Sequence, residues 1–336
     1  MESPSSNLSK AEASSATPLV SVVIPAYNAS EYIAEALDSV MAQTFKNYEV
    51  IVVNDGSPDT EQLERALEPY KDRIIYIKQK NRGPSGARNT AIRAARGEYI
   101  AMLDSDDAWL PAYLAEQVRI LSDNPDLDMI YADAWLSGDA DLPHRTFMEG
   151  APSRGPVSFE SLLRYDSSII TSGAVAKRQT LIDAGLFDEA FIRCEDFDLW
   201  IRVAHRGGKI SYQKQILAKH RAHAASLAAD TVKMVESQIE VLKKAQRTLP
   251  LTDEQRKLIE TQLAHCAAQI DLYLGKQYFH EGEFQLASEA LRRANVFYQS
   301  IKLRVVLWFL RASPGLLRFA DRARRNISRA RMARSR

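Results

Sequence analysis

Cysteines are scarce in this chain. Its 336 residues include only Cys194 and Cys266, which are far apart and lack both a CxxC spacing and an accompanying histidine pattern. This usage indicates neither a disulfide framework nor a zinc knuckle. We therefore expect a reducing compartment, with the protein in the cytoplasm.

A secretion signal and a membrane-spanning run are also lacking. Residues 1–17 are rich in Ser and Ala, lack the basic and then apolar layout of a signal peptide, and are expected to be disordered. The most apolar run, Val305–Leu310, is far shorter than the roughly 20 residues needed to cross a bilayer. The sequence therefore predicts no transmembrane helix.

The composition is that of a globular protein, 46% apolar and 26% charged, which favours one large domain with an appendage. The net charge of +1 hides an asymmetry. Residues 301–336 carry Lys302 and ten arginines against the single acid Asp321, so the remainder is acidic. The basic tail and the acidic remainder of the chain therefore need not bind the same ligands.

Strands and helices alternate in the first hundred residues. The β-branched run Val20–Ile24 predicts a buried strand, and Asn28 with Glu31 predicts a capped start for a helix over Glu31–Ala42. A second buried strand, Tyr48–Val53, begins about thirty residues after the first, the length of one βαβ unit. Further strands are expected at Ile74–Ile77 and Tyr99–Leu103, with the Gly-rich loop Asn81–Gly86 and a helix through Arg96 between them. The pattern predicts a mostly parallel sheet flanked by helices.

The second half resumes this pattern and then becomes wholly helical. After a looser stretch over Gly138–Gly155, the expected elements are strands at Asp128–Trp135, Ile169–Ala176 and Lys209–Leu217, and a helix at Glu195–Arg206. From Ala228 only helical periodicity remains. We expect an α/β domain over 18–228, a helical region over 229–300 and a basic amphipathic tail over 301–336.

One tetratricopeptide-like repeat is expected in the helical region. Its spacing is matched by Leu274, Gly275, Tyr278, Gly282, Phe284, Ala287 and Ala294, without the usual aromatic at 271 or proline near 299. One such repeat cannot bury its own apolar face.

Acidic residues follow two of the predicted strands. In open α/β sheets, ligands bind outside the carboxyl ends of the strands, where Asp55 and Asp104–Asp107 fall. If the strand persists, Asp104 and Asp106 face the same way and could bind Mg²⁺ or Mn²⁺ together with donor phosphates. Alternatively, these acids cap a helix beginning near Trp109 or Pro111.

An ordered set of motifs decides between these alternatives. They are Val22–Asn28, Val53–Ser57, Asn81–Gly83, Ala87–Asn89, Ala95–Ile100 and Leu103–Asp107, continuing in Glu195–Trp200 and His220–Leu227. Together they closely resemble glycosyltransferase family 2, over about Leu19–Ala228. The resemblance implies the GT-A fold and an inverting sugar transfer.

The resemblance also implies a donor site with a divalent metal. Its donor-binding residues would be Pro25, Tyr27, Asn28, Asp55, Arg82, Gly83, Arg88, Asp104, Ser105 and Asp106. Asp55 would contact the base, and Asp104 with Asp106 would form the DxD site for Mg²⁺ or Mn²⁺ and diphosphate. His223 matches a histidine that approaches the metal, although Ala224-Ala225 replaces the glycine or proline common there. The two arginines could bind phosphate or hold a carboxylate.

The acceptor side is expected around a second pair of acids. Asp196 matches the family's catalytic base, and Glu195 beside it would raise its proton affinity. By spacing alone, the two acids would simply stabilise a helix N-terminus. Ser172, within Ile170–Gly173, and Trp109 are further acceptor candidates, while core packing is the alternative for Trp109.

The expected partners are a nucleotide-sugar donor, most simply a UDP-sugar, and a glycan or lipid-linked acceptor. The tail could lie on an anionic membrane at the inner face of the cytoplasmic membrane, or dock on the helical region with its arginines solvated. No nucleic acid is expected, because no nucleic-acid-binding fold accompanies the arginines.

Two other functions remain as alternatives. A sugar nucleotidyltransferase would need a glycine-rich phosphate loop after the first strand, where Pro25–Asn28 stands. A catalytically silent nucleotide-sugar-binding or scaffold protein would use the helical C-terminus. The presence of Asp55, Asp104, Asp106 and Asp196 favours the enzyme over both.

Overall fold

The computed structural model describes residues 17–138, 145–223, 230–313 and 315. The chain divides into two compact units, Met1–Ser226 and Leu227–Arg336, each of which is described by itself. Most of the predicted N-terminal segment and the part of the basic tail after 315 lie outside the described residues.

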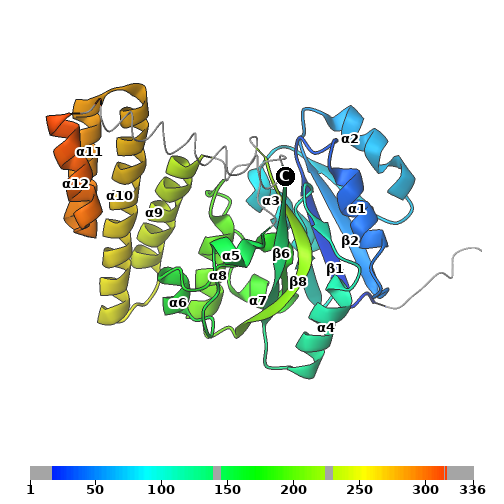
Figure 1. Cartoon of the computed structure of the whole chain (residues 1–336). Coiled ribbons are helices and arrows are strands. Elements are labelled where there is room, and N and C mark those ends of the chain that lie inside the picture. Colours follow the sequence, from blue (N-terminus) through cyan, green and yellow to red (C-terminus); the bar gives the residue numbers. More distant parts are fainter. Residues whose placement is uncertain (1–16, 139–144, 224–229, 314, 316–336) are drawn as a thin grey trace, which may run out of the picture. The chain divides into compact units, whose positions relative to one another are not determined.

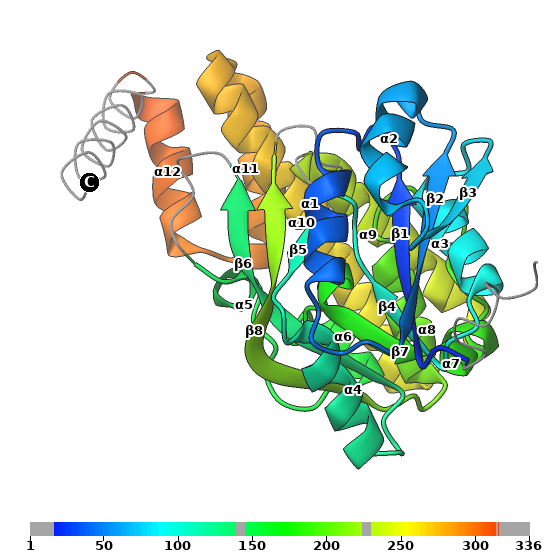
Figure 2. The same cartoon turned by 90° about the vertical axis from the view of Figure 1, so that its right-hand side faces the viewer.

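The first unit is built on one eight-stranded sheet with the order β3-β2-β1-β4-β7-β6-β8-β5. Figure 2 shows the strands fanned across the unit. Their bounds are β1 Val20–Ala26, β2 Tyr48–Asp55, β3 Ile75–Gln79, β4 Tyr99–Met102, β5 Ala108–Trp109, β6 Met129–Gly138, β7 Ala174–Lys177 and β8 Ile210–Ala222.

The sheet has a parallel half and a mixed half. Strands β3, β2, β1 and β4 are all parallel, as the βαβ spacing predicts. Strand β7 runs antiparallel to both β4 and β6, β8 is parallel to β6, and β5 is antiparallel to β8. The predicted α/β class is confirmed, with a mixed sheet.

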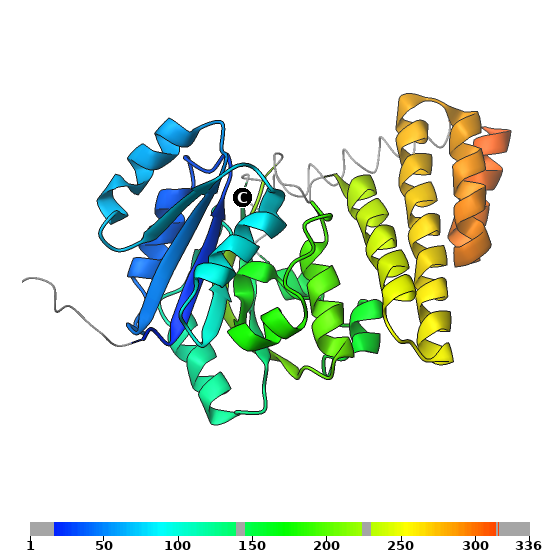
Figure 3. The same ribbon diagram turned by 180° about the vertical axis from the view of Figure 1, so that it is seen from behind.

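Strands β1 and β2 are almost wholly buried, as expected for parallel strands with helices on both faces of the sheet. Helix α1 (Ile33–Met41) packs Ile33, Leu37 and Val40 into the same core cluster as alternate β1 residues. Figures 1 and 3 show α1 and α3 (Gly83–Ala94) on opposite faces. The other helical segments are α2 Thr60–Leu67, η1 Glu68–Tyr70, α4 Tyr113–Asp123, α5 Phe147–Gly150, α6 Phe159–Leu163, η2 Thr171–Gly173, α7 Arg178–Asp183 and α8 Glu195–His205.

The start of α1 differs from the prediction. The helix begins at Ile33 without a side-chain cap, so Asn28 does not cap it. Asn28 instead has φ +53°, and its N–H donates to Ser57 Oγ at 2.6 Å. This bond ties the turn after β1 to the loop after β2, and α1 begins only after that turn, at Ile33. The predicted cap was wrong.

The second unit is helical throughout its described residues. Helices α9 (Thr231–Thr248), α10 (Asp253–Glu281), α11 (Phe284–Tyr298) and α12 (Ile301–Ala312) follow one another, in yellow to orange in Figure 3. Helix α10 starts with a capping box at Thr252 and stops at Gly282, where φ is +95°. The residues with tetratricopeptide spacing lie in α10, α11 and the turn between them. None of the described helices combines the length and apolar character that a membrane span requires.

Candidate active site

The predicted donor and acceptor residues come together at one edge of the sheet. The carboxyl ends of β1, β2, β3 and β4 share this edge because these strands are parallel. Strand β7 is antiparallel, so its amino end, next to Ser172, lies at the same edge. Strand β8 ends there just before His223, because it is parallel to β6.

Asp55, at the end of β2, is held by two donors. Asp55 is 2% exposed. Its Oδ1 accepts hydrogen bonds from Gln79 Nε2 at 2.6 Å and from the N–H of Arg82 at 2.9 Å. Gly56 follows with φ +65°, and a Cβ there would lie 2.7 Å from the backbone nitrogen of Asn81. The close approach of these loops requires glycine and fixes the carboxylate. Tyr27, 53% exposed, lies at the same edge.

Residues 104–107 form a turn rather than an extension of β4, which ends at Met102. The N–H of Asp107 donates to the carbonyl of Asp104, and the N–H of Asp104 donates to Ser172 Oγ, both at 3.1 Å. Helix α4 starts at Tyr113 with no side-chain cap. The helix-capping alternative for these acids is therefore wrong. Asp104, Ser105 and Asp106 remain partly exposed in the turn.

Arg88 links the two sets of acids. Its Nη2 lies 2.6 Å from Asp104 Oδ1, its Nη1 lies 2.6 Å from Glu195 Oε1, and its side chain is 6% exposed. Within the part of the chain that the structure describes, the Nε has no hydrogen-bond partner. Burial opposes the charged guanidinium, but the charges of Asp104 and Glu195 raise the pKa of Arg88 above its usual value. Of the two predicted roles for this arginine, the structure shows carboxylate pairing.

Asp106 faces His223. Its Oδ2 lies 3.0 Å from His223 Nε2, and the imidazole stacks on Tyr32 with ring centroids 5.4 Å apart. Burial, followed by the charges of Asp107 and Asp104, raises the pKa of Asp106. Among the described side chains, no three His, Cys, Asp or Glu groups are already gathered around one cation position. Asp104, Asp106 and His223 therefore do not form a complete cage by themselves.

Asp107 anchors the end of β8. Its side chain is fully buried, with Oδ2 at 3.0 Å from His220 Nδ1 and Oδ1 accepting the N–H of Arg221 at 2.8 Å. Burial lowers the pKa of His220, but the bond to Asp107 and the charges of Asp107, Asp104 and Asp106 together raise it to about 9. Sequence reasoning missed these partners, because they are more than a hundred residues apart.

Asp196 lies in the first turn of α8. Its Oδ2 accepts a hydrogen bond from Thr171 Oγ1 at 2.8 Å, and its Oδ1 accepts the N–H of Phe197 at 2.7 Å. Burial raises the pKa of Asp196, and the bond from Thr171 opposes that shift. Burial also raises the pKa of the adjacent Glu195 to about 7, against the charge of Arg88. Thr171 gave no signal in the sequence, because only the fold brings it to α8.

Two predicted contacts have protein partners instead. Arg82 makes a bidentate ion pair with Glu189, with Nη2 at 2.7 Å from both carboxylate oxygens. Glu189 was missed by the sequence analysis. Trp109 is 3% exposed, and its Nε1 donates to the carbonyl of Ser172 at 2.6 Å. It stacks on Tyr113. This burial favours core packing for Trp109 over direct contact with a sugar.

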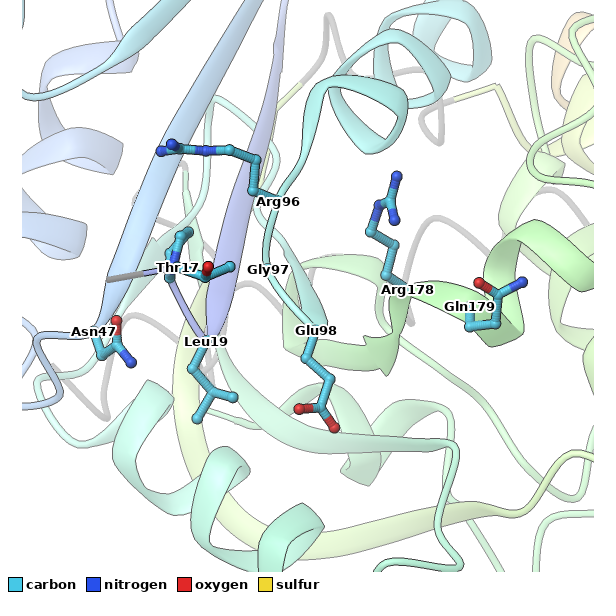
Figure 4. Close-up of a pocket in the computed structure, with 9 residues that line it drawn as sticks. Thr17, Leu19, Asn47, Arg96, Gly97, Glu98, Arg178 and Gln179 are labelled. Atoms are coloured by element: carbon cyan, nitrogen blue, oxygen red, sulfur yellow. The ribbon is translucent and has the colours of Figure 1, made fainter. Parts of the chain in front are cut away.

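A hollow of about 440 Å³ lies at the other edge of the sheet (Figure 4). Leu19 and Asn47, just before β1 and β2, help to line it together with Arg96 and Arg178. Arg96 reaches out of it to pair with Glu49, at 2.8 Å from Oε2. The hollow lies at the amino ends of the parallel strands, whereas Asp55 and Asp104–Asp107 lie at their carboxyl ends.

Sequence comparison relates the chain to one enzyme family. The profile of Glycosyl transferase family 2 matches residues 21–172. An uncharacterized glycosyltransferase of Rickettsia prowazekii is 30% identical over 86% of this chain and 91% of its own length. The UDP-Glc:α-D-GlcNAc-diphosphoundecaprenol β-1,3-glucosyltransferase WfaP of Escherichia coli is 31% identical over 67% of this chain and 86% of its own length. Some relatives are longer, since the match covers 35% and 34% of two further Rickettsia glycosyltransferases.

Comparison of structures gives the same fold. A mannosyltransferase from Pyrobaculum calidifontis, solved in complex with GDP-Man and Mn²⁺, superposes with a TM-score of 0.59 at 21% identity. The match covers 87% of this chain and 79% of that one. At this identity the likeness shows the fold alone.

Proposed function

Because the chain belongs to glycosyl transferase family 2 and is a nucleotide-sugar glycosyltransferase, we propose that it performs an inverting, metal-dependent transfer. The observation that carries this proposal is the bridge from Asp104 through Arg88 to Glu195. It joins the acids after β4 to the residue beside Asp196. A donor diphosphate and an acceptor hydroxyl could therefore meet within one site.

The donor would be a UDP-sugar, with its base at Asp55 and its diphosphate near Asp104 and Asp106. The relative that uses UDP-Glc supports this choice. Mg²⁺ or Mn²⁺ suits the residues, because burial and neighbouring carboxylates disfavour the charge on Asp106 and a cation would relieve that penalty. Asp106, Asp104 and His223 would hold the metal, with donor phosphate oxygens completing its ligands. When bound, the cation neutralises charge on the leaving diphosphate.

Asp196 would act as the general base. A carboxylate within hydrogen-bond reach of the acceptor hydroxyl can accept its proton as the oxygen attacks the sugar's anomeric carbon. The bonds from Thr171 and Phe197 fix its orientation, while burial raises its pKa and so strengthens it as a base. Arg88 touches Glu195 rather than Asp196 and would act as a positioning residue. Attack opposite the departing diphosphate inverts the anomeric configuration.

The acceptor would be a glycan or a lipid-linked saccharide, approached at the Asp196 side of the site. Trp109 is 3% exposed and Ser172 is 1% exposed, so both are covered, and Glu195, 8% exposed, is the remaining candidate for an acceptor contact. A lipid-linked acceptor is supported by the diphosphoundecaprenol substrate named for one relative. Such an acceptor would require the enzyme to work at the cytoplasmic face of a membrane.

Two measurements test this proposal. A panel of UDP- and GDP-sugars with Mn²⁺ should identify the donor by thermal stabilisation, and EDTA should remove most of that effect. Asp196→Asn should lower sugar transfer by about 10²–10⁴-fold, because an amide cannot accept the proton, and should leave stabilisation by Mn²⁺ and UDP unchanged. Asp183→Asn, which makes the same change at an exposed position of α7, is the control. Near-normal transfer by Asp196→Asn would rule out its role as the base.

A further inference from the structure

Helix α12 is apolar on two faces, although only one of them is buried. Leu303, Val306, Leu307 and Leu310 pack into a core cluster with Ala287 and Leu291 of α11. The opposite face leaves Ile301, Val305 and Trp308 exposed by 69%, 49% and 62%. Their spacing of four and three residues places these side chains on one stripe. Packing within the helical unit therefore buries only one of the two apolar faces of α12.

Cations surround the exposed stripe. Lys302, Arg304 and Arg311 are exposed, and α12 contains no acidic residue. An exposed tryptophan with aliphatic neighbours and a basic border is the composition that binds the interface of an anionic bilayer. A water-facing helix would instead carry polar residues on this side. In the sequence, residues 316–336 after this helix include eight arginines and one acid.

We propose that the outward face of α12, formed by Ile301, Val305 and Trp308 with Lys302, Arg304 and Arg311, binds an anionic lipid bilayer. The apolar side chains would enter the boundary between headgroups and acyl chains while the cations contact lipid phosphates. The docking and membrane alternatives raised by the sequence are thus assigned to opposite faces of one helix. This surface does not depend on the proposed reaction, although it would suit a lipid-linked acceptor.

Vesicle flotation of the full chain tests this surface. Wild-type protein should float with phosphatidylcholine vesicles that contain phosphatidylglycerol, and much less with phosphatidylcholine alone or at high salt. Val305→Gln with Trp308→Gln should weaken binding to the anionic vesicles by at least about tenfold, because it removes much of the apolar stripe. The matched control is Leu286→Gln, which changes a leucine of α11 that is 44% exposed. It should bind as the wild type does.

Bromine-labelled acyl chains give a direct readout. Trp308 fluorescence should be quenched by brominated anionic vesicles. Trp308→Phe should abolish this quenching and leave only the unquenched fluorescence of Trp109, Trp135 and Trp200. The proposal fails if wild-type protein does not float, or if the double variant floats equally well. It also fails if the double variant only converts a dimer to a monomer in sedimentation. Thermal stabilisation by Mn²⁺ and UDP should be unchanged in all variants, so failure here leaves the proposed reaction intact.

Discussion

At the scale of single residues, the site is organised by side chains that hold two of the acids and His223 in place. Arg88, Thr171 and Tyr32 contact Asp104, Asp196 and His223 respectively. None of Arg88, Thr171 and Tyr32 is itself an acid or one of the predicted metal ligands. Their contribution is to fix the orientation of the groups that they contact.

Thr171 gives a prediction about pH. Its hydroxyl donates to Asp196 and so favours the carboxylate, while burial raises the pKa of Asp196 above the ordinary 3.8. Thr171→Val removes this bond, so the pKa should rise further. Because the base works only when ionised, the acidic limb of the kcat/KM profile should move to higher pH. Thr171→Ser should restore the wild-type limb, and a limb unchanged in the valine variant would contradict this account.

The sequence was informative about the acids and about Arg88, but not about Thr171 or Glu189. Asp55, Asp104, Asp106 and Asp196 could be singled out as candidates because they stand in ordered local motifs. Thr171 and Glu189 could not, because neither lies in a motif and their partners come from distant elements. Trp109 was ambiguous for a similar reason, since burial is set by the assembled core.

At the scale of elements, α3 ties the donor side to the acceptor side. Besides Arg88, and Arg82 just before its first residue, this helix contributes Ser85 and Asn89, which bond to backbone groups of the segment before α8. The position of Asp196 is thereby linked to the helix that follows β3. The strands were predictable from apolar runs, but this bracing was not, because it uses buried polar side chains without periodicity.

Asn89→Ala should loosen this bracing. Asn89 is 2% exposed, and its amide bonds to both the N–H and the carbonyl of Phe187, at 2.9 and 2.8 Å. Alanine would leave both buried groups without a partner, so the free energy of unfolding should fall by about 2–3 kcal/mol. Denaturant unfolding measures the change. Asn124→Ala, which removes an exposed asparagine bonded to Ile120, should cost less than about 0.5 kcal/mol. Equal effects of the two variants would refute the bracing role.

At the scale of the whole molecule, the chain separates into a catalytic unit and a helical unit. The catalytic residues proposed above lie in the first unit, and the proposed lipid surface lies in the second. Sequence periodicity predicted a boundary near this point, because only helical periodicity remains from Ala228 onward.

Gly275→Val should destabilise the helical unit alone. A Cβ at Gly275 would lie 2.6 Å from Leu291 Cγ, so a valine would force α10 and α11 apart at a cost of about 1–3 kcal/mol. The thermal transition of the helical unit should fall, while stabilisation of the other transition by Mn²⁺ and UDP persists. Gln277→Ala, at an exposed position of α10, should change neither. Loss of nucleotide binding in the valine variant would show that the units are not independent.

The anchoring of β8 by Asp107 also has a consequence for biosynthesis. The acidic turn gains His220, Arg221 and His223 as partners only from the end of the last strand of the sheet. A nascent chain on the ribosome can therefore complete this turn only after residue 223 has emerged. Until then, the clustered carboxylates would repel one another without the compensating contacts of β8. Nucleotide-sugar binding should thus arise late in synthesis, after the entire catalytic sheet has been translated.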